Sequence, residues 1–168
     1  MNITNNALSI KDMKDIINKL GWNNIFDVGL YSKLDFNNNK PKIILIQSDK
    51  CPLYGHWCMF YNNIFYDASG NKPLEIFDKY NLDKNKQDYN KLFNYFKKFN
   101  DIDYNNYDFQ KKLNSQTCGH HCIVRYFYND LDNEQYKKFL FLIKKTCGYN
   151  NFDDLIVDLC KLIINKNA

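Results

Sequence analysis

The chain has 168 residues, of which 45% are hydrophobic, and a formal net charge of +4. This length suits one folded domain over residues 1–168. The charge excess is too small to indicate a dedicated nucleic-acid-binding protein, and no apolar run approaches the roughly 20 residues that cross a bilayer. Without the basic start and apolar run of a signal peptide, we expect a soluble intracellular or particle-packaged protein, whose six cysteines are free thiols rather than disulfides.

The N-terminal third predicts one helix and one buried strand. Ser9 is a typical N-cap for a helix whose apolar residues recur at helical spacing as far as Leu20, and Gly21 ends that helix. The stretch from 22 to 39 is expected to be irregular. A β-branched run bounded by turn residues then predicts a buried strand over Lys42–Gln47.

A β-hairpin is predicted in the middle of the chain. Its strands cover Gly55–Tyr61 and Ile64–Asp67, and between them lies Asn62-Asn63, a dipeptide that tolerates the positive φ of a tight turn. The hairpin puts His56 near its start and Asp67 at its end, where adjacent strands present side chains to one face.

The rest of the chain is predicted to be mainly helical. Pro73 suits the first position of a short helix, and Tyr89–Phe99 has the apolar spacing of an amphipathic helix. A polar, Tyr-rich segment predicts a short edge strand at Tyr104–Phe109. Strands in the middle and helices at the end indicate an α+β fold, with a small mixed or antiparallel central sheet flanked by helices. The last three predicted helices cover Cys118–Tyr128, Asn133–Lys145 and Phe152–Asn165.

Cys118 is the best candidate for a catalytic nucleophile. It begins a predicted helix, where unpaired amide groups and the positive end of the helix dipole favour a thiolate. His56, on a strand, is the candidate base, and Asp67 is the candidate group that orients it. Upstream of the cysteine, Gln110 or Gln116 is the candidate side-chain donor to an oxyanion, with the Cys118 backbone N–H as the second donor.

Two strings carry a resemblance to a known family. GHWCMFYNNIFYDASGNKP (55–73) and QKKLNSQTCGHHC (110–122) are similar to the adenovirus-type maturation proteases, in the versions of virophages and Polinton-like elements. The shared features are a His-Trp pair, an acidic residue after the next strand, an acidic-Ser-x-Gly loop, and a Gln followed by Cys-Gly. The resemblance covers roughly residues 43–128.

The resemblance implies a papain-like fold of the clan CE type, with the nucleophile at a helix N-terminus. His56, Asp67 and Cys118 would form the catalytic triad, Trp57 would pack beside it, and Gln110 would donate to the oxyanion. Gln110 lies one residue further from the cysteine than the family pattern expects, so the choice between the two glutamines stays open.

The family also implies a function. Its members are viral cysteine endopeptidases, which need no cofactor, cleave capsid and core precursor proteins near small residues such as glycine, and act in the virion and the host cytoplasm. Some are activated by DNA and a short peptide. A ubiquitin-like-protein protease of the same clan is the alternative enzyme, since it would share the triad order and the Gln-to-Cys segment.

A non-catalytic zinc-binding or nucleic-acid-binding module is the alternative from another class. Cysteine and histidine are good zinc ligands, but the spacing here lacks the two well-separated pairs of zinc fingers and knuckles. The residues that this interpretation would use are Cys51, His56, Cys58, Cys118, His120, His121 and Cys122.

The remaining candidates are expected to be structural. Of His120 and His121, one is expected to pack or cap and the other to be exposed. Asp78 and Asp101 are the nearest alternatives to the proposed acid, but neither ends a strand paired with that of the histidine. The remaining thiols expected in the core are Cys122, Cys147 and Cys160.

Overall fold

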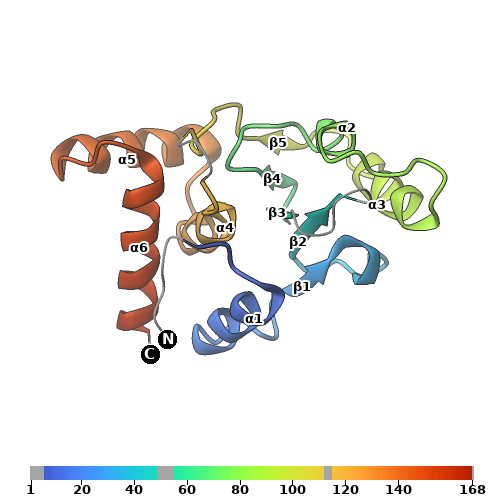
Figure 1. The fold of residues 1–168 in the computed structure, drawn as a ribbon, viewed down its shortest axis with the longest axis horizontal. Helices are drawn as coiled ribbons and strands as arrows, with labels where there is room; N and C mark the ends of the chain where they lie inside the picture. The colour runs from blue at the N-terminus through green and yellow to red at the C-terminus, as the bar shows by residue number, and fades with distance from the viewer. Residues whose placement is uncertain (1–5, 49–54, 112–114, 168) are drawn as a thin grey trace.

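A computed structural model describes residues 6–48, 55–111 and 115–167 of the protein. Within these ranges, a five-stranded sheet in the order β1-β2-β3-β4-β5 runs between two sets of helices (Figure 1). The elements are, in chain order, α1 (Ile10–Lys19), β1 (Asp27–Leu30), the 3-10 helix η1 (Tyr31–Lys33), β2 (Lys42–Gln47), β3 (Gly55–Tyr61), β4 (Ile64–Tyr66), α2 (Glu75–Lys79), α3 (Gln87–Lys97), β5 (Asp103–Tyr104), α4 (Cys118–Phe127), α5 (Asn133–Thr146) and α6 (Phe152–Lys166).

The sheet is mixed. Its three central strands pair antiparallel, whereas β1 joins β2 and β5 joins β4 in parallel. The predicted α+β class, with a small mixed sheet between helices, is confirmed. Among the described helices, none combines the length and apolar character needed to cross a bilayer.

The predicted hairpin is confirmed. Asn62 and Asn63 have φ values of 45° and 59°, the left-handed conformation that a two-residue turn between right-twisted strands requires. Tyr61 therefore pairs directly with Ile64. The second strand ends at Tyr66, so that Asp67 is the first residue beyond it.

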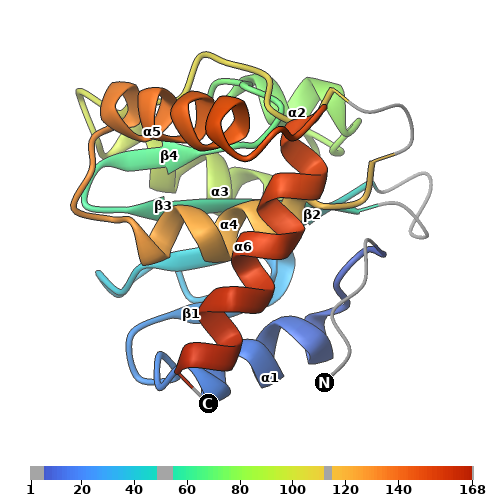
Figure 2. The same cartoon turned by 90° about the vertical axis from the view of Figure 1, so that its left-hand side faces the viewer.

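Two hydrophobic clusters cover the two faces of the sheet. Alternate residues of β3 point to opposite faces: Trp57 and Met59 belong to the cluster with α1, α4, α5 and α6, and Cys58 and Phe60 to the cluster with α2 and α3. Helix α4 packs directly on β3, and α6 packs on the outer side of α4 (Figure 2). The start of α4 is therefore buried between the sheet and the C-terminal helix.

Two predictions about strands were wrong. The stretch from 22 to 39, expected to be irregular, contains β1 and η1, because tertiary pairing of Val28 with Ile43 forms a strand that the local sequence does not favour. The edge strand expected at Tyr104–Phe109 is only Asp103–Tyr104. It stops because the Asn105 side chain bonds both backbone groups of Asp67, replacing the ladder there.

The short helix after the hairpin also begins later than predicted. Pro73 lies in a turn before α2 instead of at its first position. This turn is closed by the carboxylate of Glu75, which accepts a hydrogen bond of 2.9 Å from the Lys72 amide. The helix therefore begins only at Glu75.

Gly70 in the loop after Asp67 provides a test of how closely this loop packs against the backbone of Tyr107. Gly70 and Gly148 both have positive φ, +74° and +73°, but a Cβ on Gly70 would lie 2.9 Å from the Tyr107 carbonyl carbon, whereas one on Gly148 would meet nothing within 4 Å. We expect Gly148→Ala to lower the free energy of unfolding by about 1–2 kcal/mol through backbone strain. Gly70→Ala should lower it by about 2–4 kcal/mol, because overlap adds to strain. Urea denaturation measures both, and equal losses would contradict this account.

Candidate active site

His56 and Asp67 form a buried pair at one end of the hairpin. His56 Nε2 lies 2.6 Å from Asp67 Oδ1, and the two side chains are 6% and 0% exposed. Extending the register of β3 and β4 by one residue sets Asp67 opposite Cys58. His56 is then the diagonal neighbour of Asp67 on the same face, within reach of a long side chain. The hairpin thus builds this contact from local geometry.

The Asp67 carboxylate is held by further donors. It accepts hydrogen bonds from the Ser69 amide at 2.8 Å and from the Asn71 side chain. The buried Asn105 side chain binds the backbone of Asp67 from the other side, at 2.9 and 2.7 Å. Burial raises the pKa of Asp67. The charge and hydrogen bond of His56, together with the hydrogen bonds from Asn71 and Ser69, outweigh the burial and lower this pKa below its ordinary value. The acid is therefore ionised and fixed in orientation.

Cys118 faces this pair from the first turn of α4. Its Sγ accepts a hydrogen bond of 3.4 Å from the backbone N–H of Trp57, the residue after His56. A Cβ on Gly119 would come within 3.1 Å of the Trp57 ring, so glycine allows the helix to approach the strand this closely. The structure therefore brings His56, Asp67 and Cys118 together from segments far apart in the sequence.

The charge state of His56 follows from its neighbours. Burial alone lowers the pKa of the imidazole, but the Asp67 carboxylate, and after it Cys118, raise this pKa to about 10. Since Nε2 is bonded to Asp67, Nδ1 is the nitrogen that remains for Cys118. The imidazole, with its raised pKa, therefore lies between the Asp67 carboxylate and the Cys118 sulfur.

Tyr80 completes this side of the site. Its ring stacks on the His56 imidazole, with centroids 5.2 Å apart and an angle of 13° between the planes. The half-buried tyrosine follows α2 and covers the face of the imidazole. Sequence reasoning missed this residue, because nothing in its local pattern connects it to the histidine.

The two candidate glutamines make different contacts. Gln110 is half-buried, and its Nε2 donates to the carbonyl oxygen and the hydroxyl of Ser115, at 3.1 and 3.4 Å. Gln116 is exposed, and its Oε1 accepts a hydrogen bond of 3.2 Å from the Ala7 amide. Gln110 thus contacts the nucleophile strap, which we define as Ser115–Thr117, and Gln116 holds the segment before α1.

Trp57 packs beside the nucleophile, as the resemblance implied. Its ring is buried, and the indole Nε1 donates a hydrogen bond of 2.8 Å to the carbonyl oxygen of Leu8. The alternative acids lie elsewhere: Asp78 is exposed and pairs with Lys84 at 3.3 Å, and Asp101 is exposed. Neither contacts His56.

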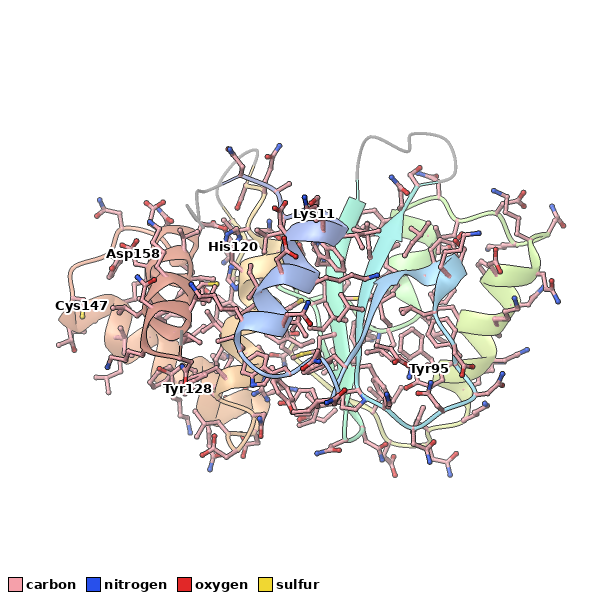
Figure 3. The ribbon with its side chains drawn as sticks, turned by 90° about the horizontal axis from the view of Figure 1, so that it is seen from below. Lys11, Tyr95, His120, Tyr128, Cys147 and Asp158 are labelled. Atoms are coloured by element: carbon pink, nitrogen blue, oxygen red, sulfur yellow. The ribbon has the colours of Figure 1, made fainter. Side chains whose placement is uncertain are left out.

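Two structural predictions about histidine and cysteine were wrong. His120 and His121 are both fully buried, because this turn of α4 lies between the sheet and α6. Cys147 is exposed, because it is the C-cap residue at the outer end of α5, and Figure 3 shows it far from His120. Cys122 and Cys160 lie in the core as predicted.

Among the residues that the structure describes, no group of three or more His, Cys, Asp or Glu side chains is arranged to hold a metal ion. Cys51, one residue of the zinc interpretation, lies outside the described residues.

Comparisons with protein-family models, with curated proteins and with solved structures gave no match for this chain. The chemistry of the site therefore carries the functional inference. That chemistry consists of a buried acid–imidazole pair, a cysteine at a helix start, and the peptide groups around them.

Replacing the acid tests the electrostatics of the pair. In Asp67→Asn, we expect the pKa of His56 to fall from about 10 to its ordinary value of about 6.5 or lower, because burial then acts without the carboxylate. An NMR titration of the imidazole carbons measures this pKa. The matched control is Asp78→Asn, which removes an exposed carboxylate and leaves the His56 pKa unchanged. A pKa near 10 in Asp67→Asn would contradict the assignment.

The same pair predicts how stability depends on pH. Because folding raises the pKa of His56, the pair contributes its full stability below the unfolded value of about 6.5, and this contribution is lost as the pH rises through about 10. Urea denaturation between pH 6 and pH 10.5 should show a decline in the wild type that Asp67→Asn lacks. Parallel pH profiles for the two proteins would argue against a charged pair.

Proposed function

We propose that the protein is a cysteine endopeptidase of the adenovirus-protease type. The observation that carries this proposal is the approach of Cys118, at the start of α4, to a buried His56–Asp67 pair. His56 lies on β3, Asp67 directly follows β4 and Cys118 begins α4, and backbone N–H groups donate to Asp67 and to Cys118. The resemblance of the two strings to the family supports the same assignment of roles.

The chemistry begins with acylation. The Cys118 thiolate attacks the scissile carbonyl carbon, and the electron pair of the C=O bond moves to its oxygen. The oxyanion accepts hydrogen bonds from the Cys118 backbone N–H and from an N–H of the Gln110 amide. Collapse restores the C=O bond and breaks the C–N bond, and the leaving amine takes the proton from His56. A thioester remains on Cys118.

Deacylation uses the same residues in reverse. His56, now neutral, takes a proton from water as the water oxygen attacks the thioester carbon. The second oxyanion collapses, the C–S bond breaks, and the acid product leaves. Sγ departs as a thiolate beside the protonated imidazole, so the initial state is restored. Asp67 orients His56 throughout and stabilises its positive charge.

The biological role proposed here comes from the family. The substrates would be capsid and core precursor proteins, cut near small residues such as glycine during virion maturation. The enzyme would act in the virion and in the viral factory of the host cytoplasm. DNA or a short peptide is the proposed activator, and the net charge of +4 is compatible with DNA.

The activity is tested with internally quenched peptides that contain small residues at the cleaved bond. We expect the wild type to cleave some of them and Cys118→Ala to lose about 10⁴-fold or more in kcat, because no other group replaces the nucleophile. The matched control is Cys147→Ala, which removes an exposed thiol and leaves kcat unchanged. Equal cleavage by wild type and Cys118→Ala would exclude Cys118 as the nucleophile.

Thiol alkylation tests the ion pair without a substrate. At pH 6, iodoacetamide should label Cys118 ahead of the exposed Cys147, since the protonated His56 favours a thiolate at Cys118. Peptide mass spectrometry quantifies both sites in one sample. Faster labelling of Cys147, or one bound zinc per chain by elemental analysis, would favour a non-catalytic module.

Vinyl sulfone probes built on ubiquitin and SUMO distinguish the alternative enzyme. A capsid-processing protease should react slowly with both probes, because the sequence near the cleaved bond of a capsid precursor differs from that of ubiquitin or SUMO. Rapid labelling of Cys118 by either probe would instead assign the chain to the ubiquitin-like-protein proteases.

A further inference from the structure

Asp153 is a buried carboxylate outside the triad. It lies in the first turn of α6, with 2% of its surface exposed. Its Oδ1 accepts hydrogen bonds from the hydroxyls of Ser115 and Thr117, the first and last residues of the nucleophile strap. Figure 2 shows how this is possible, since α6 crosses directly over α4. The C-terminal helix thus holds the segment that leads into the nucleophile.

The hydrogen bond from Thr117 to Asp153 takes the place of an ordinary helix-capping bond. Thr117 is the N-cap residue of α4, where a threonine hydroxyl usually accepts a hydrogen bond from the first turn of its helix. Here the side chain makes no capping bond, and its hydroxyl donates to Asp153 instead. The backbone N–H groups at the start of α4 are therefore not capped by this hydroxyl.

We propose that Asp153 is a positioning residue for the oxyanion hole, which holds the nucleophile strap so that the Gln110 amide and the Cys118 N–H face one point. This inference rests on the proposed function, because it assigns a role within the same reaction.

The first step of the argument connects Asp153 to Gln110. Ser115 donates its hydroxyl hydrogen to the carboxylate, and its oxygen then accepts from Gln110 Nε2 at 3.4 Å. The Thr117 hydroxyl donates to the same carboxylate oxygen, so the strap is held at two points. The orientation of the glutamine amide therefore depends on a hydroxyl that Asp153 fixes.

The second step connects Asp153 to Asp67 through His121 and Tyr66. His121 Nε2 lies 3.8 Å from Asp153 Oδ1, and His121 Nδ1 lies 3.2 Å from the hydroxyl of Tyr66. Burial lowers the pKa of His121 and raises that of Tyr66, so the imidazole is neutral and the phenol keeps its proton. The consistent tautomer has Nε2–H facing the carboxylate and Nδ1 accepting from Tyr66. Tyr66 immediately precedes Asp67.

A carboxylate suits this position better than an amide. Two hydroxyl groups donate to Asp153, the His121 imidazole faces it at 3.8 Å, and an ionised carboxylate is an acceptor only. Burial raises the pKa of Asp153, but the nearby His121 imidazole and the hydrogen bonds from Ser115 and Thr117 lower this pKa below its ordinary value. The negative charge makes each of these bonds stronger than its neutral counterpart would be.

The experiment separates acyl transfer from thiol reactivity. The full-length wild type, Asp153→Ala, Asp153→Asn and Asp154→Ala are compared in peptide cleavage and in alkylation of Cys118 by iodoacetamide. Alkylation is a direct displacement, in which Sγ bonds to carbon as iodide leaves, and it forms no oxyanion. Asp154→Ala is the matched control, because it removes a carboxylate from the same helix turn, where Asp154 contacts Asn151.

We expect Asp153→Ala to lower kcat about 10- to 100-fold, less than or similar to the loss of one oxyanion donor. Its KM and its alkylation rate should stay within about threefold of the wild type, because the His56–Cys118 pair remains. Asp153→Asn should lose less, since an amide oxygen still accepts from the strap. Asp154→Ala should match the wild type in kcat.

Three results would overturn the proposal or its basis. Parallel losses of kcat and alkylation in Asp153→Ala would indicate a general structural role. A kcat for Asp153→Ala equal to that of Asp154→Ala would remove the positioning role alone, whereas a wild type that cleaves no peptide would refute the proposed function itself.

A second measurement applies even if Asp153→Ala does not fold. Ser115→Ala should lower kcat by itself, because it breaks the connection between the carboxylate and Gln110. The double variant Asp153→Asn/Ser115→Ala should then lose no more than the worse single variant. Additive losses would show that the two residues act independently and would exclude the proposed connection.

Discussion

The contact between His56 and Asp67 is the interaction on which the site depends. At 2.6 Å in a buried setting, it stabilises the positive charge of the imidazole, and the remaining acceptors of the carboxylate need donors of their own. The loop after β4 meets this requirement with the Ser69 amide and the Asn71 side chain. Removing either His56 or Asp67 would leave an uncompensated charge in the core. The surrounding contacts therefore stabilise the pair.

The hairpin lowers the entropy cost of forming this pair, because its turn and register bring together two side chains that are only eleven residues apart in the sequence. The nucleophile is different. Cys118 reaches the pair only because α4 packs on β3, and this packing depends on the small Gly119 against the ring of Trp57. The N–H of Trp57 then donates to the sulfur, so that one strand positions both His56 and Cys118.

The C-terminal helix supports the site from behind. Asp153 binds both ends of the nucleophile strap and faces His121, which in turn contacts Tyr66 next to Asp67. Buried polar chains of this kind are costly unless fully satisfied, and when satisfied they hold one arrangement of the backbone. The site is thus held by one charged pair within the hairpin and by a second polar cluster between α4 and α6.

The sequence by itself determined the local parts of this protein. The Asn62-Asn63 turn, the strands beside it, the helix that begins at Cys118 and the α+β class followed from periodicity and turn chemistry, which act over a few residues. The His56–Asp67 contact was predictable for the same reason. Tertiary structure decided what needed distant partners: the strand β1 formed by pairing with β2, the end of β5 at Asn105, the stack of Tyr80 on His56, and the burial of His121 and Asp153. None of these has a local signal, because each depends on a packing surface supplied by a segment far away in the chain.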